Sequence, residues 1–327
     1  MRFILRRLGF YFVAFWAAIT INFLLPRLLP GNPIDYFLAR YQNQLAANPH
    51  LLDSLRPAFD FKHQSLLEQY RQYLINLLHL NFGVSYSRFP TPVNEMIGQA
   101  IPWSLFLAGL SAVLAFTIGT FLGIIAAWRR GKTVDVVVTP LTMFTQSFPA
   151  FFVALLILYF GGVVAGWFPI NHAYGDGVQS GPNLPFILDV LRHAAMPLCA
   201  LLLSSIGGWM LGMRAVMINT LSEDYVSMAQ AKGLSNRRVM LMYAARNALL
   251  PQVTSFAIVL GYAITSLVLI ENVFAYPGLG YLMVTAVQAT DYPLMQGIFF
   301  LLTVGMLAAN LIADFVYVLL DPRAASA

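Results

Sequence analysis

The sequence has 327 residues, of which 59% are hydrophobic and only 10% are charged. An average soluble domain carries about 25% charged residues, whereas the mean hydropathy here is +0.70. So few charges cannot cover the surface of a water-soluble globule. The composition therefore excludes an ordinary cytosolic enzyme, a disordered chain and a coiled coil, and it indicates a membrane protein.

Six apolar runs are long enough to span a bilayer as helices, which takes about 20 residues. They cover residues 8–25, 103–127, 136–170, 194–213, 248–270 and 292–313. The third run is unusually long and contains Pro140 and Pro149. Because a lipid-exposed backbone must satisfy its own hydrogen bonds, we expect an all-α membrane protein with six transmembrane helices. A cleaved signal peptide is an alternative for the first run, but no small-residue cleavage site follows it.

Basic residues gather in four segments that alternate with these runs. They are Arg2, Arg6, Arg7, Arg129, Arg130, Lys132, Arg214, Lys232, Arg237, Arg238, Arg246 and Arg323. With six helices all four segments lie on one side of the membrane, and the positive-inside rule makes that side cytoplasmic. We therefore expect both termini in the cytoplasm.

The runs predict three parts of the chain. Residues 1–30 form the N-terminal cytoplasmic end and the first helix, residues 31–98 an extracytoplasmic insertion, and residues 99–327 a transmembrane core with a cytoplasmic loop at 220–247. Within the insertion, residues 32–35 read as a helix start. A second helix is predicted to end at Gly83, and Thr91-Pro92 to start the helix leading into the second run. The expected apolar face of the second helix consists of Leu66, Leu67, Tyr70, Tyr73, Leu74, Leu77 and Leu78.

The sequence shows no machinery for catalysis or for binding a metal or cofactor. Gly131-Lys132-Thr133 lacks the upstream glycine of a phosphate-binding loop and follows an apolar helix, so we expect no ATP site in this chain. No histidine pair has the spacing of metal ligands. The central parts of the six runs contain no ionisable residue. Gly119 with Gly123, and Gly208 with Gly212, have the spacing that lets helices pack closely.

The loop between the fourth and fifth runs predicts a short helix. Thr220 and Glu223 have capping-box spacing, Gly233 suits the end of the helix, and Ser235 suits the start of the next one. From these residues alone, a surface that docks on another protein and a plain amphipathic connector are equally good interpretations.

This loop resembles the coupling loop of ABC importer permeases. That family has Glu-Ala-Ala, three residues, Gly and a distal Leu-Pro, of which this chain keeps Ala229, Gly233, Leu250 and Pro251. It departs from the pattern at Ser227 and Met228, in the manner of the dipeptide, oligopeptide and nickel branch. Segments 29–33, 81–85, 271–280, 291–293 and 320–323 also look like that branch.

The resemblance implies the type I fold of these permeases and a role as one membrane subunit of an ATP-driven peptide importer. The implied partners are a second homologous permease, two cytoplasmic ATPases that use ATP and Mg, and an extracytoplasmic solute-binding protein. Ala229, Ala231 and Gly233 would lie against the ATPase, bordered by Glu223, Asp224, Tyr225 and Lys232. An oligosaccharide importer of the same family is the main alternative. An ion-coupled secondary transporter and a membrane enzyme are the alternatives from other classes.

A second candidate site follows the fifth run. Pro277 and the glycines beside it disfavour a continuing helix after Glu271. We expect the chain to fold back here at the outer mouth of the path, where it contacts the binding protein or closes the path. The residues assigned to this outer gate are Glu271, Tyr276, Pro277, Gly278 and Gly280. The alternative is an ordinary loop capped by Glu271.

Overall fold

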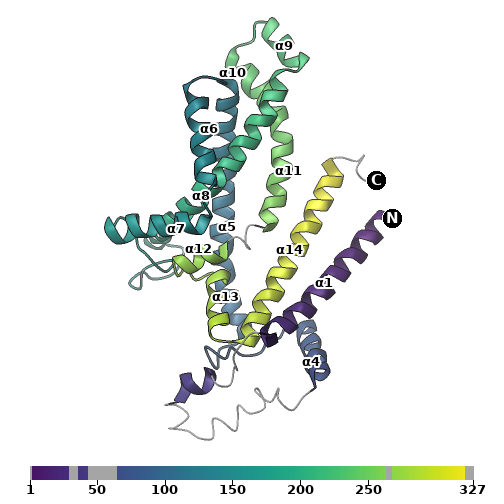
Figure 1. Ribbon diagram of the computed structural model, residues 1–327, viewed down its shortest axis with the longest axis vertical. Helices are drawn as coiled ribbons and strands as arrows, with labels where there is room; N and C mark the ends of the chain where they lie inside the picture. The colour runs from purple at the N-terminus through teal and green to yellow at the C-terminus, as the bar shows by residue number, and fades with distance from the viewer. Residues whose placement is uncertain (1, 29–35, 43–64, 263–266, 321–327) are drawn as a thin grey trace. The chain divides into compact units, whose positions relative to one another are not determined.

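The computed structural model describes residues 2–28, 36–42, 65–262 and 267–320. Its regular elements are helices (Figure 1). Four of them are long and apolar enough to cross a membrane: Gly9–Leu28, Val93–Trp128, Leu184–Leu221 and Tyr292–Ile312. They lie in α1 (Arg2–Leu28), α5 (Val93–Trp128), α8 (Leu184–Leu221) and α14 (Tyr292–Leu320). Four predicted runs are therefore confirmed as span-length helices.

The third run is not one straight helix. It forms α6 (Thr133–Gln146), α7 (Ala150–Ile157) and the π-helix η2 (Leu158–Val164), and the chain bends by 97° between α6 and α7. The bend falls beside Pro149, whereas Pro140 lies inside α6. Proline at 149 has no backbone N–H to continue the helix. Counting the bent pair as one span gives five candidates among the described residues.

The fifth run is only partly described. The short helix α10 (Asn236–Arg238) and the π-helix η3 (Val239–Ala245) lead into α11 (Arg246–Tyr262). Residues 263–266 lie outside the described part, and α12 (Val268–Val273) follows them. The six-helix prediction therefore rests on the sequence at this run.

The chain divides into two compact units, and the second contains most of the helices. It consists of residues 103–280 and 308–327. Glycines let α8 approach its neighbours closely: a Cβ at Gly119 would lie 2.6 Å from Trp209 Cβ, and one at Gly123 would lie 2.6 Å from the Met210 carbonyl. The predicted packing role of Gly119 and Gly123 is confirmed.

The other predicted glycine pair does not pack against backbone. Gly208 and Gly212 face only the side chains of Gln146 and Gln252, and it is Gly207 that meets α6, at the Thr142 carbonyl. Gly207 lies one position before Gly208, about 100° around the helix, and so points to a different neighbour. The spacing of Gly208 and Gly212 was therefore misleading.

The first unit consists of residues 1–102 and 281–307. In it, α4 (Leu66–Leu78) begins with a full capping box between Ser65 and Glu68. Ile19 and Phe23 of α1 pack with Tyr73 and Leu77 of α4. A buried carboxylate, Asp291, precedes α14 and accepts hydrogen bonds from Ser85 and Ser87.

Two details of the predicted insertion are wrong. Leu66, Leu67 and Leu78 are 64%, 77% and 84% exposed, so they are not on the buried face of α4. The helix ends at Leu78 with His79 as its C-cap, five residues before Gly83. The start of α5 after Pro92 is confirmed, and the predicted helix start at 32–35 lies outside the described residues.

The close contact at Gly119 gives a stability prediction with a matched control. Gly119→Ala should lower the free energy of unfolding by about 1–3 kcal/mol, because the methyl group overlaps Trp209. Gly109→Ala, on the same helix with no atom within 4 Å of its Cβ, should be neutral or stabilising by up to about 1 kcal/mol. Thermal unfolding of the purified protein in detergent measures both. Equal midpoints for the two variants would contradict the close packing.

Candidate functional site

The predicted short helix in the 220–247 loop is present as α9 (Asp224–Ala231). It ends in a Schellman motif, in which Leu234 N–H donates to the Ala229 carbonyl and Gly233 N–H to the Gln230 carbonyl. Gly233 has φ = +73°, a left-handed conformation that favours glycine. The expected role of Gly233 as the end of this helix is confirmed.

The starts of the two loop helices differ in detail from the prediction. Thr220 still belongs to α8 and donates its hydroxyl to the Val216 carbonyl, so it does not cap α9. Glu223 takes the N-cap position instead, and Ser235 takes that of α10, each without a side-chain cap bond. The spacing of Thr220 and Glu223 was misleading because α8 runs one residue further than Thr220.

One face of α9 is buried inside the protein. Val226 is 0% and Ala229 2% exposed, and both pack in a cluster with Met217, Val239 and Ala244. Ala229, which the sequence assigns to the ATPase contact, therefore packs against this chain itself. This burial fixes α9 on η3 and on the end of α8.

The opposite face of α9 is open. Six of the seven residues assigned to the coupling site are exposed in α9 or at its two ends: Glu223, Asp224, Tyr225, Ala231, Lys232 and Gly233. Met228 is 59% exposed on the same face and was not assigned to the site. Its helical spacing from Tyr225 and Lys232 would have identified it. The exposed face offers small, apolar and charged groups to a partner.

The second candidate site is a turn built around a buried carboxylate. Glu271 in α12 is 0% exposed, and it accepts hydrogen bonds from Ser104 Oγ and Gly280 N–H, both at 2.6 Å. Ser104 in turn accepts from Leu279 N–H at 2.8 Å. A buried carboxylate is stable only with such donors. Glu271 therefore ties the start of α13 (Leu279–Gln288) to α5 and α12.

The turn itself leaves no room for a side chain at Gly278. A Cβ there would overlap the Glu271 carboxylate, and one at Gly280 would overlap the backbone of Val268. Tyr276 is fully buried, and its ring meets Trp103 edge to face at 6.1 Å. The break in the helix after Glu271 is confirmed, and with Pro277 the five assigned residues lie in one compact fold-back.

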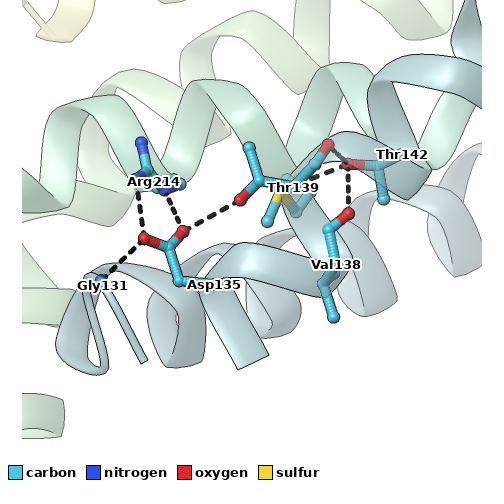
Figure 2. A network of polar contacts seen from close by, with 7 residues as sticks. Gly131, Asp135, Val138, Thr139, Thr142 and Arg214 are labelled. Atoms are coloured by element: carbon cyan, nitrogen blue, oxygen red, sulfur yellow. Dashed lines mark hydrogen bonds and ion pairs between the residues drawn. The ribbon is translucent and has the colours of Figure 1, made fainter. Parts of the chain in front are cut away.

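Besides the two candidate sites, the structure contains an ion-pair cluster that the sequence did not predict. Arg214 of α8 donates from Nε and Nη2 to the two carboxylate oxygens of Asp135 in α6, at 2.6 and 2.9 Å (Figure 2). Gly131 N–H and the Thr139 hydroxyl complete four donors on this carboxylate, which fill its acceptor positions. The sequence did contain a signal for this pair. Asp135 directly precedes the third apolar run and Arg214 directly follows the fourth, so two opposite charges lie on the same predicted side of the membrane.

The buried carboxylates of the described residues are not grouped as metal ligands. Within the described ranges, no three His, Cys, Asp or Glu side chains gather as a metal site would require. The buried carboxylates of Asp135, Glu271 and Asp291 are each held by hydroxyl or N–H donors from neighbouring segments. These groups serve as structural anchors in this arrangement.

Comparison with known protein families matches residues 119–326 to one family, described as binding-protein-dependent transport system inner membrane component. The matched region includes α9, the fold-back and Arg214. The chain belongs to this family. It is therefore a multi-pass membrane component of a transport system that depends on a binding protein, and not an enzyme.

Relatives match nearly the whole chain. It is 33% identical to a putative peptide permease protein of Brucella suis, over 99% of this chain and 98% of that one. It is 31% identical to the di/tripeptide transport system permease protein DppB of Pseudomonas aeruginosa, with the same coverage. It is also 31% identical to the oligopeptide transport system permease protein AppB of Bacillus subtilis, over 93% and 92% of the two chains.

The four donors on Asp135 predict an asymmetric response to charge changes. Arg214→Gln should lower the free energy of unfolding by about 2–4 kcal/mol, because it leaves the buried carboxylate without its cation. The exchange Asp135→Arg with Arg214→Asp should not restore stability, because Gly131 N–H and the Thr139 hydroxyl would then face a cation. Denaturation of the three proteins in detergent measures this. Full rescue by the exchange would show that only the ion pair matters.

Proposed function

We propose that this chain is one of two homologous membrane subunits of an ATP-driven importer that carries peptides across the cytoplasmic (inner) membrane. Two cytoplasmic ATPase subunits hydrolyse ATP with Mg, and an extracytoplasmic solute-binding protein delivers the solute. The chain itself binds no cofactor and performs no chemistry on the solute. It spans the membrane with six helices, and both termini lie in the cytoplasm.

The observation that carries this proposal is the two-faced construction of α9. On one face, Val226 and Ala229 are buried against the rest of the chain. On the other face, Tyr225, Met228 and Lys232 are exposed to solvent. A helix that is rigidly attached and open on one side can transmit a push from a partner to η3 and α11, which pack behind it. In the second unit, α9 and α12 lie at opposite ends (Figure 1), which suits a cytoplasmic coupling site and an outer gate.

Peptides are the favoured solute because the relatives described above are named as peptide, di/tripeptide and oligopeptide permeases. An oligosaccharide importer of the same family remains the alternative solute assignment. An ion-coupled secondary transporter would need a membrane-embedded carboxylate free to take up a proton. The four donors on Asp135 and the hydrogen bonds to Glu271 oppose such a role for these two groups.

The fold-back around Glu271 serves as the outer gate in this proposal. Gly278 and Gly280 lie against Glu271, so a movement of α12 is passed directly to the start of α13. ATP binding closes the ATPase pair, α9 moves with it, and the permease alternates between inward-facing and outward-facing states.

The coupling role is tested by placing a charge on each face of α9. Met228→Glu should leave membrane insertion and thermal stability unchanged but lower co-purification of the ATPases by about tenfold or more, since it puts a charge into the contact. It should also abolish solute-stimulated ATP hydrolysis.

Ala229→Glu is the matched control, because the charge then enters this chain's own core. It should lower the stability of the permease itself by several kcal/mol. Wild-type ATPase association and stimulation in Met228→Glu would mean that α9 is only a connector. That result would remove the main support for the proposed function.

The outer gate is tested by one glycine substitution in the fold-back and one control substitution elsewhere in the second unit. Gly278→Ala pushes a methyl group into the Glu271 carboxylate and should uncouple ATP hydrolysis from solute uptake at normal subunit levels. Gly177→Ala, whose Cβ meets no atom within 4 Å, should behave as wild type. Uptake and ATP hydrolysis in reconstituted vesicles measure both. Normal coupling in Gly278→Ala would reduce the fold-back to an ordinary loop.

A further inference from the structure

The first unit contains a cavity of about 270 Å³ that neither candidate site uses, and its mainly apolar lining carries several polar groups. It lies among the end of α1, the inner side of α4, the segment 81–86 and the start of α14. The residues lining it are Arg27, Gln69, Gln72, Tyr73, Asn76, Leu77, Asn81, Phe82, Gly83, Val84, Tyr86, Pro293 and Gln296. The polar side chains among them are those of Arg27, five amides and two tyrosines.

Two polar groups of the lining are buried without a hydrogen-bond partner in the described part of the chain. They are the hydroxyl of Tyr73, a residue only 8% exposed, and Nε2 of Gln296. Buried polar groups normally have partners, and one left without any needs an explanation. Burial raises the pKa of Tyr73, so its hydroxyl stays protonated and available as a donor.

Arg27 supplies the charge of the cavity. Its Nε donates to Gln69 and its Nη1 to the Phe23 carbonyl, while its Cζ stacks 3.7 Å from the centre of the Phe23 ring. These contacts engage Nε and Nη1 of the guanidinium, which carries five N–H donors in all. Among the described residues, no carboxylate lines the cavity. Arg27 and the two unpartnered donors suit an anionic oxygen group. Gln72 Nε2 donates to Asn76 Oδ1, and Asn81 Oδ1 accepts from Gly83 N–H, so the remaining positions of these amides suit neighbouring hydroxyls.

The position of the cavity indicates where the bound anion comes from. Arg27 lies at the end of the candidate span Gly9–Leu28, and Gln296 lies in the first turns of the span Tyr292–Ile312. Leu28, Leu66, Leu67 and Leu78 are exposed on the helices around the cavity, at 82%, 64%, 77% and 84%. Exposed leucines beside an arginine at the end of a span are typical of the membrane interface.

We propose that this cavity binds the headgroup of an anionic, hydroxyl-bearing phospholipid such as phosphatidylglycerol. The phosphate lies against Arg27 and receives the donors of Tyr73 and Gln296. The hydroxyls of the headgroup meet the amides, and the acyl chains leave past the exposed leucines of α4. The lipid thereby fixes α4 to the outer ends of α1 and α14.

The test is native mass spectrometry of the full-length permease, purified from membranes and loaded with defined lipids. Wild type should retain phosphatidylglycerol in preference to phosphatidylcholine. Arg27→Gln should weaken this retention about tenfold or more, through loss of a charge-assisted contact. Arg71→Gln, which removes a charge from α4 at a residue outside the lining, should retain the lipid as wild type does. Tyr73→Phe, which removes only the unpartnered hydroxyl, should weaken retention several-fold.

Competition on the wild-type protein tests the assignment without any variant. Millimolar glycerol 3-phosphate, inorganic phosphate or a dipeptide should leave phosphatidylglycerol bound. Displacement by either phosphate would overturn the lipid assignment in favour of a small soluble anion, and displacement by the dipeptide would overturn it in favour of a solute site. Equal retention of phosphatidylcholine, or equal losses in Arg27→Gln and Arg71→Gln, would also overturn it. None of these outcomes bears on the coupling role of α9, which the ATPase co-purification measures separately.

Discussion

The close approach of α8 to its neighbours is the contact on which the second unit depends. Lipid gives helices no hydrophobic reason to associate, so they are held together by tight packing and polar contacts. Gly119 and Gly123 bring α5 against α8, Gly207 brings α6 against it, and Arg214 adds a charged contact to α6. α9 follows directly after α8, so its position depends on this packing.

Buried carboxylates recur where helices begin or break. Asp135 closes the turn before α6, Glu271 holds the turn between α12 and α13, and Asp291 joins the segment 85–87 to the start of α14. Each break frees backbone N–H groups, and a carboxylate supplies acceptors for them. The cost of burying each charge is offset by several donors, which fixes the turn in one conformation.

The two candidate functional sites use this rigidity in different ways. α9 presents an open face whose underside is packed on the rest of the unit, so it can receive a force from outside. The fold-back at Glu271 is closed on itself: Gly278 has no free volume around it, and Tyr276 is buried. A small displacement there is transmitted because packed groups cannot absorb it. In the second unit these two candidate sites lie at opposite ends (Figure 1).

The sequence by itself determined the class of the protein, its family and most of its long helices, because apolar runs of spanning length and short motifs such as Ala229 to Gly233 are local features. It also located the end of α9, since a left-handed glycine is a local requirement. Only the tertiary structure decided which face each side chain takes. Ala229 turned inward, Leu66 and Leu67 turned outward, and the third run bent by 97° beside Pro149 and not at Pro140. The Asp135–Arg214 pair joins residues 79 positions apart, and the lining of the cavity in the first unit comes from four segments. Burial and pairing of this kind depend on which helices become neighbours, and periodicity along one helix carries no information about that choice.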